Sequence, residues 1–245
     1  MNWLRAFYRA LVAMFIDGPR LWWLAPLIPL FAFVPEFAQH VAEIKLGMFA
    51  SPEAFKALQN DPTRWGFGYA KIAGLFLTIF AAARYWSLPS GLRAGWWDLR
   101  KMAWRQFLIG LALNAAISGI LYFAKTALSP ASFDVVNITL SLATLPVLVY
   151  MIGALLGDGA VSLRNCYQRG WLQALAMAAF FLLAMLPAQL LHRFNHTLAM
   201  GAPTTAVWAL MLWDAVLVSV MACWAGTGLA KGYAIGSPSA EAKSA

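Results

Sequence analysis

The sequence predicts an all-α integral membrane protein with six transmembrane helices and three amphipathic helices on the cytoplasmic membrane surface. Hydrophobic residues fill 62% of the 245 positions and charged residues only 11%, whereas a soluble domain carries about 25% charged residues. So little charge cannot cover a water-facing surface, so lipid must contact most of the exterior. The 12 tryptophans agree with this class, because indole rings favour the headgroup region.

Six apolar segments have about the 20 residues that a helix needs to cross the hydrocarbon core. They lie near residues 21–43, 67–87, 106–125, 135–157, 171–192 and 203–230. In the first, Pro26, Pro29 and Pro35 predict a kink or a break, because proline lacks a backbone donor. In the loop that follows it, Ser51 as N-cap and Pro52 at the first position predict a short helix to Asn60.

A Leu-Arg-x-x-aromatic pattern begins at Leu4, at Leu92 and at Leu163, each time before an odd-numbered span. The residues around the three copies predict interfacial helices with an apolar face toward lipid and cations toward headgroups. We place them from the N-terminus to a break at Asp17-Gly18-Pro19, from Leu92 to Ala103, and from Ala160 to Arg169.

The spacing of these copies suggests a single polytopic domain, 1–232, built of three repeats over 1–87, 88–157 and 158–232. The alternative is convergence, because any chain that enters a membrane from the cytoplasm favours arginine and aromatic residues. After the last span, small and polar residues predict a flexible cytoplasmic tail over 233–245.

Charge sets the orientation of the chain in the membrane. Six of the 18 lysines and arginines fall on the side opposite the termini, which leaves 12 on the terminal side. Cytoplasmic loops carry the excess of such residues, so both termini are expected in the cytoplasm, which for a bacterial protein means the inner membrane. The six are Lys45, Lys56, Arg64, Lys71, Lys125 and Arg193.

The net charge of +8 favours anionic membrane lipids as partners rather than nucleic acid, because the charges flank apolar runs. Two Gly-x-x-x-Gly patterns, at Gly153 and at Gly228, allow close helix contact within the chain, with other membrane proteins or with a second copy. The expected headgroup contacts are Arg5, Arg9, Arg93, Arg100, Lys101, Arg164 and Arg169.

Asp214 is the acid that lies deepest in a predicted span, about 17 Å from the external end of the last one. An ionisable residue inside the membrane is a functional candidate, either for cation binding or for a proton relay. The structural alternative is a protonated Asp214, or a hydrogen bond from Asn114, which has a similar depth in the third span.

A second candidate site involves all three histidines, which fall at the external membrane face. Imidazole and carboxylate are ligands for zinc or iron, and pairs on a helix can converge on one ion. The residues are Glu36, His40 and Glu43 at the end of the first span, and His192 and His196 at the end of the fifth. Solvated side chains at a membrane boundary are the alternative, and no motif otherwise implies a cofactor.

The segment from Trp3 to Tyr8, the Gly18-Pro19 pair and the run from Ser162 to Trp171 resemble a group of bacterial six-helix membrane proteins. The group includes the YciC-like inner-membrane proteins and the membrane domain of some glycerophosphodiester phosphodiesterases. The resemblance implies a topology, and it transfers no activity or catalytic residue.

Three functions remain open from the sequence. A non-enzymatic accessory, scaffold or lipid-organising protein is favoured, because no catalytic motif is present. A small transporter or channel would use Asp214. A membrane metalloenzyme would use the external histidines and glutamates.

Overall fold

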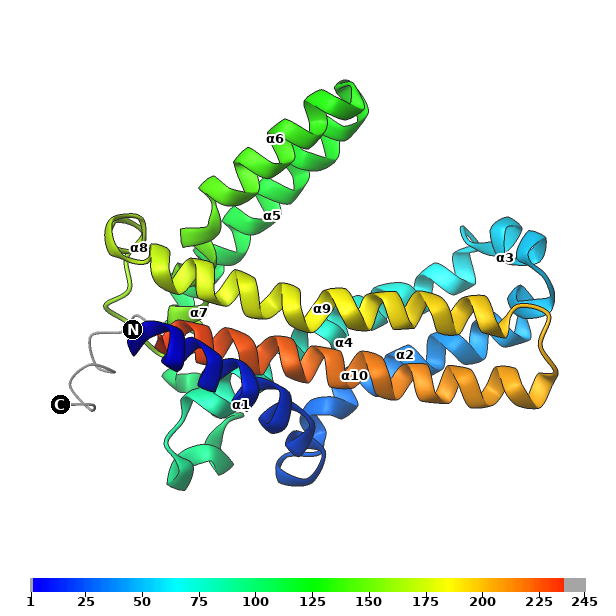
Figure 1. The fold of residues 1–245 in the computed structure, drawn as a ribbon, viewed down its shortest axis with the longest axis horizontal. Coiled ribbons are helices and arrows are strands. Elements are labelled where there is room, and N and C mark those ends of the chain that lie inside the picture. Colours follow the sequence, from blue (N-terminus) through cyan, green and yellow to red (C-terminus); the bar gives the residue numbers. More distant parts are fainter. Residues whose placement is uncertain (1, 236–245) are drawn as a thin grey trace. The chain divides into compact units, whose positions relative to one another are not determined.

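The chain forms helices joined by short turns in the computed structural model, which describes residues 2–235 (Figure 1). No strand occurs in this part of the chain, so the predicted all-α class is confirmed for it. In order, the elements are α1 (Asn2–Leu24), α2 (Leu27–Lys45), η1 (Met48–Ala50), α3 (Pro52–Leu58), α4 (Pro62–Ser87), η2 (Ser90–Gly95), η3 (Leu99–Lys101), α5 (Trp104–Ala127), α6 (Pro130–Ala143), α7 (Leu145–Leu155), α8 (Leu163–Arg169), α9 (Trp171–Ala199) and α10 (Thr204–Ala234).

Among the described residues, α2, α4, α5, α9 and α10 are long and apolar enough to cross a membrane. The pair α6 and α7 passes the same test together, but it bends by 41° at the break between them. The part of the chain that the structure describes therefore has five helices of a membrane-spanning kind, or six if the bent pair is one span. The number of spans and the threefold repeat stay predictions.

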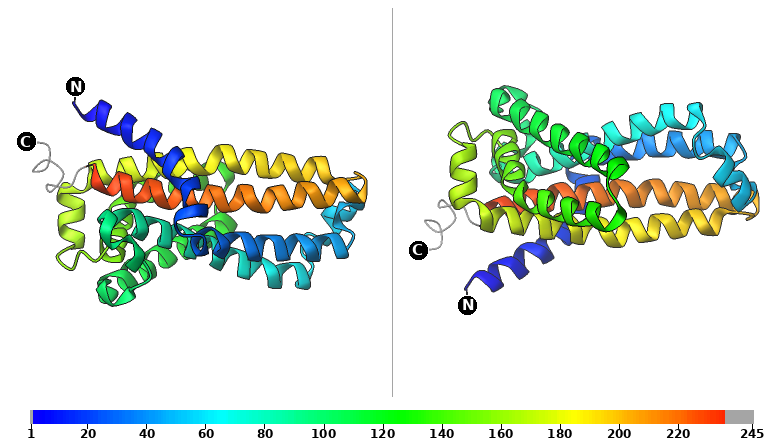
Figure 2. Two further views of the ribbon diagram at one scale, coloured as in Figure 1. Left: turned by 90° about the horizontal axis from the view of Figure 1, so that it is seen from below. Right: turned by 90° about the horizontal axis from the view of Figure 1, so that it is seen from above.

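By internal contacts the chain falls into two compact units. Of the described residues, unit 1 comprises 2–10, 84–180 and 229–235, and unit 2 comprises 11–83 and 181–228. In unit 1, α5 packs along α6 and α7 as a hairpin (Figure 1). In unit 2, α2 and the unit 2 parts of α4, α9 and α10 lie side by side as a bundle (Figures 1 and 2).

Close backbone contacts and buried apolar side chains hold the unit 2 bundle together. Gly74 brings α4 so near to α2 that a side chain there would meet the carbonyl oxygen of Phe31. One turn further along α4, Thr78 Oγ1 donates a hydrogen bond of 3.0 Å to the carbonyl of Ile28 on α2. The cluster that joins α9 and α10 consists of Ala188, Leu217, Val218 and Met221.

The predicted break at Asp17-Gly18-Pro19 is wrong, because α1 runs through these residues to Leu24. Pro19 has no N–H for the carbonyl four residues earlier, that of Phe15. Trp224 of α10 supplies the missing donor, since its indole Nε1 lies 3.1 Å from the Phe15 oxygen. Gly18 allows this approach, because a Cβ there would meet the Trp224 ring. The glycine is thus a contact point rather than a helix end.

The break predicted from the prolines occurs at one of the three. The first predicted span divides at Ala25 and Pro26, so its first turn belongs to α1 and the rest is α2. The helix α2 then continues through Pro35. The carbonyl that Pro35 leaves without a helical donor is that of Phe31, and this is the oxygen against which Gly74 packs.

The second interfacial helix, predicted from Leu92 to Ala103, is also wrong, because two short 3₁₀ turns, η2 and η3, occupy this segment. The guanidinium of Arg84 donates to the carbonyl oxygens of Trp96, at 2.9 Å, and of Asp98. It also donates to Leu155 at 2.7 Å. The carbonyls of Trp96 and Asp98 accept from Arg84 instead of from the backbone N–H groups of an α-helix. This tertiary contact outweighs the preference of the amphipathic sequence for a helix.

Two short helices occur where the sequence predicts them. The helix α3 begins at Pro52, and Ser51 accepts a hydrogen bond from the N–H of Ala54. The helix α8 covers the end of the third predicted interfacial segment. The tail prediction over 233–245 falls mostly outside the described residues, but α10 extends to Ala234.

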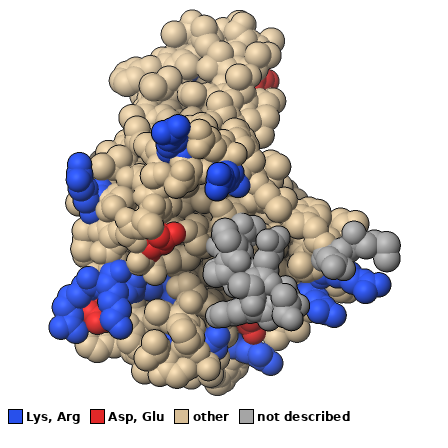
Figure 3. All heavy atoms as spheres, turned by 90° about the vertical axis from the view of Figure 1, so that its left-hand side faces the viewer, with Lys and Arg blue, Asp and Glu red and all other residues tan. Residues whose placement is uncertain are grey.

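The predicted headgroup contacts are accessible in the structure. Figure 3 shows several lysine and arginine side chains, and fewer acidic ones, on a face that is otherwise uncharged. Arg93 is partly exposed, and the other six predicted contacts are exposed: Arg5, Arg9, Arg100, Lys101, Arg164 and Arg169.

Candidate functional site

The candidate site is a buried cluster of histidines and acids inside unit 2. The helix α2 contributes Glu36, His40 and Glu43, whose spacing of four and three residues places them on one helical face. Glu36 and His40 are fully buried, and Glu43 is 1% exposed. Such residues are seldom fully buried unless they are paired, so their partners define the chemistry of the cluster.

Asp214 of α10 is the centre of the cluster and is also fully buried. Its Oδ2 lies 3.0 Å from His40 Nε2, 2.6 Å from His192 Nδ1 and 3.7 Å from His196 Nε2. Its other oxygen, Oδ1, accepts a hydrogen bond of 2.8 Å from Asn195 Nδ2. Asn195 thus fixes the carboxylate so that one oxygen faces three imidazoles.

Two cations from α4 neutralise the acids of α2. Lys71 Nζ lies 2.7 Å from Glu36 Oε1, and Arg64 Nε lies 2.8 Å from Glu43 Oε1. Both cations are partly exposed, whereas the acids are not. Three carboxylates therefore face two long cations, which leaves one negative charge to be balanced within the cluster.

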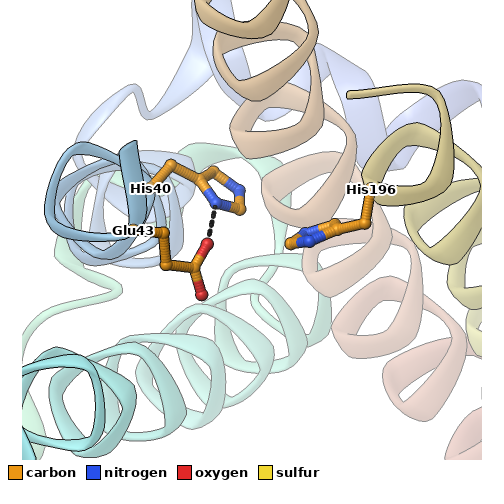
Figure 4. Close-up of side chains that lie close together, drawn as sticks. All are labelled: His40, Glu43 and His196. Carbon is orange, nitrogen blue, oxygen red and sulfur yellow. Dashed lines mark hydrogen bonds and ion pairs between the residues drawn. The ribbon is translucent and has the colours of Figure 1, made fainter. Parts of the chain in front are cut away.

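His40 can balance that charge. Its Nδ1 lies 3.0 Å from Glu43 Oε2 (Figure 4), and its Nε2 lies 3.0 Å from Asp214 Oδ2. A neutral imidazole has one N–H and an imidazolium has two. Only the imidazolium can donate to both ionised carboxylates. Without another cation at the cluster, the geometry favours a proton held on His40.

His196 is one of the side chains that this network leaves unsatisfied. It is 9% exposed, and its Nε2 is buried with no hydrogen-bond partner. The distance of 3.7 Å to Asp214 Oδ2 is too long for a hydrogen bond. Glu36 Oε2 and Gln39 Oε1 are likewise buried without a partner. Buried polar atoms are nearly always bonded, and of these three atoms His196 Nε2 is the one that faces Asp214, so it points to a ligand there.

The ligand atoms meet the spacing of a metal site in three overlapping sets, each with its atoms within 4.8 Å of one another. Tetrahedral zinc with ligands at about 2.05 Å separates neighbouring ligand atoms by about 3.3 Å. The distances of 2.6 Å and 3.7 Å around Asp214 Oδ2 differ from this by less than about 1 Å. The sets are His192, His196 and Asp214; Glu36, His40 and Asp214; and His40, Glu43 and His196.

The structure brings together six of the seven predicted intramembrane and external candidates, all except Asn114. Asn114 donates instead to the carbonyl of Gly110, at 2.8 Å, and lies 3.8 Å from Met151 Sδ. The predicted pairing of Asn114 with Asp214 is therefore wrong. The reason is that both oxygens of Asp214 are taken by partners from α2 and α9.

The helix that carries His192 is longer than the fifth predicted span. The helix α9 continues to Ala199, so His192 lies two turns inside it rather than at its end. The sequence reasoning missed Lys71, Arg64 and Asn195 as members of the cluster. Asn195 could have been predicted from the sequence, because it follows His192 by three residues and therefore lies on the same helical face.

Comparison with protein-family models, with curated proteins and with solved structures finds no match for the chain. The resemblance to YciC-like proteins therefore stays a prediction.

Proposed function

We propose that the chain is a non-enzymatic membrane protein that binds one divalent transition-metal ion of the zinc class on His192, His196 and Asp214. The observation that carries the proposal is the buried Nε2 of His196, which has no hydrogen-bond partner and faces Asp214 at 3.7 Å. That distance is unfavourable for a hydrogen bond but close to the separation of two ligands on one ion.

The charge of the cluster favours one ion over two. Glu36 and Glu43 each have an ion pair with a cation from α4, so Asp214 is the carboxylate left for a metal. A divalent ion there would take the place of the proton on His40, because metal binding and protonation compete at such clusters. A second ion would add charge beside Lys71 and Arg64 without a further acid to balance it.

Burial supports a role that does not involve a large substrate. Asp214 is fully buried, and the His192 and His196 side chains are only 15% and 11% exposed. A small ion fits such a site, whereas a substrate would have to displace packed helices. The ion would hold α9 and α10 together beside α2, in keeping with an accessory or scaffold protein.

The setting of this function follows from the sequence. We place both termini in the cytoplasm, because 12 of the 18 basic residues lie on that side of the predicted topology. The resemblance to YciC-like proteins favours a bacterial inner membrane. Its basic segments would contact anionic headgroups through residues such as Arg100 and Arg164, and its apolar faces would contact other membrane proteins or a second copy.

The test is zinc binding by the purified full chain after treatment with a chelator. We expect about one equivalent of zinc by elemental analysis. At a free zinc concentration of about 100 times Kd, the folded state gains about 2.7 kcal/mol, which raises Tm by about 5–11 °C. Tryptophan fluorescence reports the melting.

Variants separate the ligands from their surroundings. His196→Ala removes a ligand and should weaken zinc binding by more than about 100-fold, while Asn195→Ala should weaken it by about 10- to 100-fold. Asn114→Ala is the matched control, since this polar residue of α5 has no contact with the cluster residues. Zinc retained equally by His196→Ala, or no zinc retained and an unchanged Tm, would contradict the proposal.

A further inference from the structure

A groove on unit 2 lies between α2 and the beginning of α4 and has a volume of about 590 Å³. Its walls are mainly apolar, with Phe33, Phe37 and Val41 on α2 and Phe67 on α4. The charged residue among those that line it is Lys45, the last residue of α2, and Thr63, at the start of α4, also lines it.

The groove is separate from the histidine cluster. Residues on an α-helix are about 100° apart, so Val41 is rotated by about 140° from Glu36, and Lys45 by about 180°. Most of the α2 residues that line the groove therefore face away from Glu36, His40 and Glu43, and Phe33, seven residues before His40, lies at the border between the two faces. One helix presents buried ionisable groups on one side and an apolar surface on the other.

The length of the groove matches one leaflet of a bilayer. Lys45 follows Phe33 by 12 residues, which is about 18 Å along a helix axis. Half of the hydrocarbon core is about 15 Å. An acyl chain of one leaflet can thus lie along Phe33, Phe37 and Val41, with its headgroup at the level of Lys45.

The polar end of the groove selects the headgroup. Lys45 is exposed, and lysine near a helix end extends its ammonium group toward the headgroup region. The acid nearest to Thr63 in sequence is Asp61, whose Oδ1 accepts the N–H groups of Thr63 and Arg64. Asp61 therefore caps the beginning of α4, and among the described residues Lys45 has no ion pair, so its ammonium group is available to a phosphate.

We infer that this groove binds an anionic phospholipid, with an acyl chain against α2 and α4 and the phosphate at Lys45. The inference is independent of the proposed metal site, because no residue that lines the groove belongs to the histidine cluster.

The test compares phosphatidylglycerol with phosphatidylcholine. The full chain is purified in detergent micelles that contain equal amounts of both lipids, and the lipids that remain bound are counted by native mass spectrometry. We expect preferential retention of phosphatidylglycerol. Lys45→Gln should weaken that retention about fivefold, the equivalent of about 1 kcal/mol for a basic residue at an anionic membrane surface.

Two further variants assign the site. Lys56→Gln, on α3 outside the groove lining, is the matched control and should leave retention unchanged. Ala38→Trp fills the groove and should release both lipids. Equal retention of the two lipids by the unaltered chain would mean that any acyl chain fills the groove and would overturn the inference. An equal loss in Lys56→Gln, or bound lipid unaffected by Ala38→Trp, would overturn it as well.

Discussion

The contact between Trp224 and the carbonyl of Phe15 allows a quantitative test of why α1 continues through Pro19. Trp224→Phe keeps an aromatic ring and removes the indole donor, whose distance to the Phe15 oxygen is 3.1 Å. Pro19 gives this oxygen no helical donor. Hydrogen bonds between membrane helices average about 0.6 kcal/mol and reach about 1.7 kcal/mol. We expect a cost of about 1.5 kcal/mol, because no second donor replaces the indole.

Pro19→Ala provides the second half of the test. Alanine restores the N–H that can donate to the Phe15 oxygen within α1. Trp224→Phe should then cost less, and the coupling energy between the two substitutions should be about 1 kcal/mol. The double-mutant cycle cancels the loss of ring packing, which is the same in both backgrounds.

The free energy of unfolding is measured by reversible titration from mild detergent into SDS, for the unaltered chain, both single variants and the double variant. Tryptophan fluorescence is corrected for the lost indole. A coupling energy within about 0.3 kcal/mol of zero would refute the reasoning, since it would mean that water satisfies the Phe15 oxygen when Trp224 does not.

Two other predictions concern glycine packing and a buried thiol. Gly74→Ala should lower the free energy of unfolding by about 1–3 kcal/mol, because the new Cβ meets the Phe31 carbonyl. Gly66→Ala, on the same helix with open space around it, should raise the free energy of unfolding by up to about 1 kcal/mol. The same SDS titration checks both variants, and equal shifts would contradict the packing argument. Burial and the charge of Asp158 raise the pKa of Cys166 from 9.0 to about 11. Because the thiolate is the reactive form, iodoacetamide should modify Cys166 slowly at pH 8 in a Cys223→Ser chain, with a rate that rises about tenfold per pH unit up to pH 10. Asp158→Asn should lower this pKa and speed the reaction at pH 8, and a rate independent of pH would exclude the assignment.

Hydropathy located the helices well because it depends on composition along the chain rather than on contacts. The apolar runs near 67–87, 106–125 and 203–230 correspond to α4, α5 and α10. The sequence signals that failed were those that a distant residue overrides. Gly18-Pro19 alone predicts a helix end, but Trp224 donates to the Phe15 carbonyl and the helix continues. The segment after Leu92 alone predicts an amphipathic helix, but Arg84 donates to the carbonyl of Trp96 in this segment.

The histidine cluster could be predicted in part. All three histidines fell at the same predicted face of the membrane, which follows from topology alone. The pairing of His192 with Asp214 could have been predicted, because the turn at Gly201 joins α9 and α10. Measured along the helices from this turn, the two residues differ by about 5 Å. The ion pairs to Lys71 and Arg64 could not be predicted, because they depend on the rotation of α4 about its axis. Apolar residues are spread around all faces of this helix, so the sequence does not specify that rotation.

The whole histidine content of the protein lies at one place. The chain has three histidines, and all of them surround Asp214. Selective isotope labelling of histidine would therefore give magnetic resonance signals from this cluster alone, without assignment of the other residues. The same fact argues for an untagged chain or a tag without histidine, because a polyhistidine tail would bring more imidazole groups than the protein itself contains.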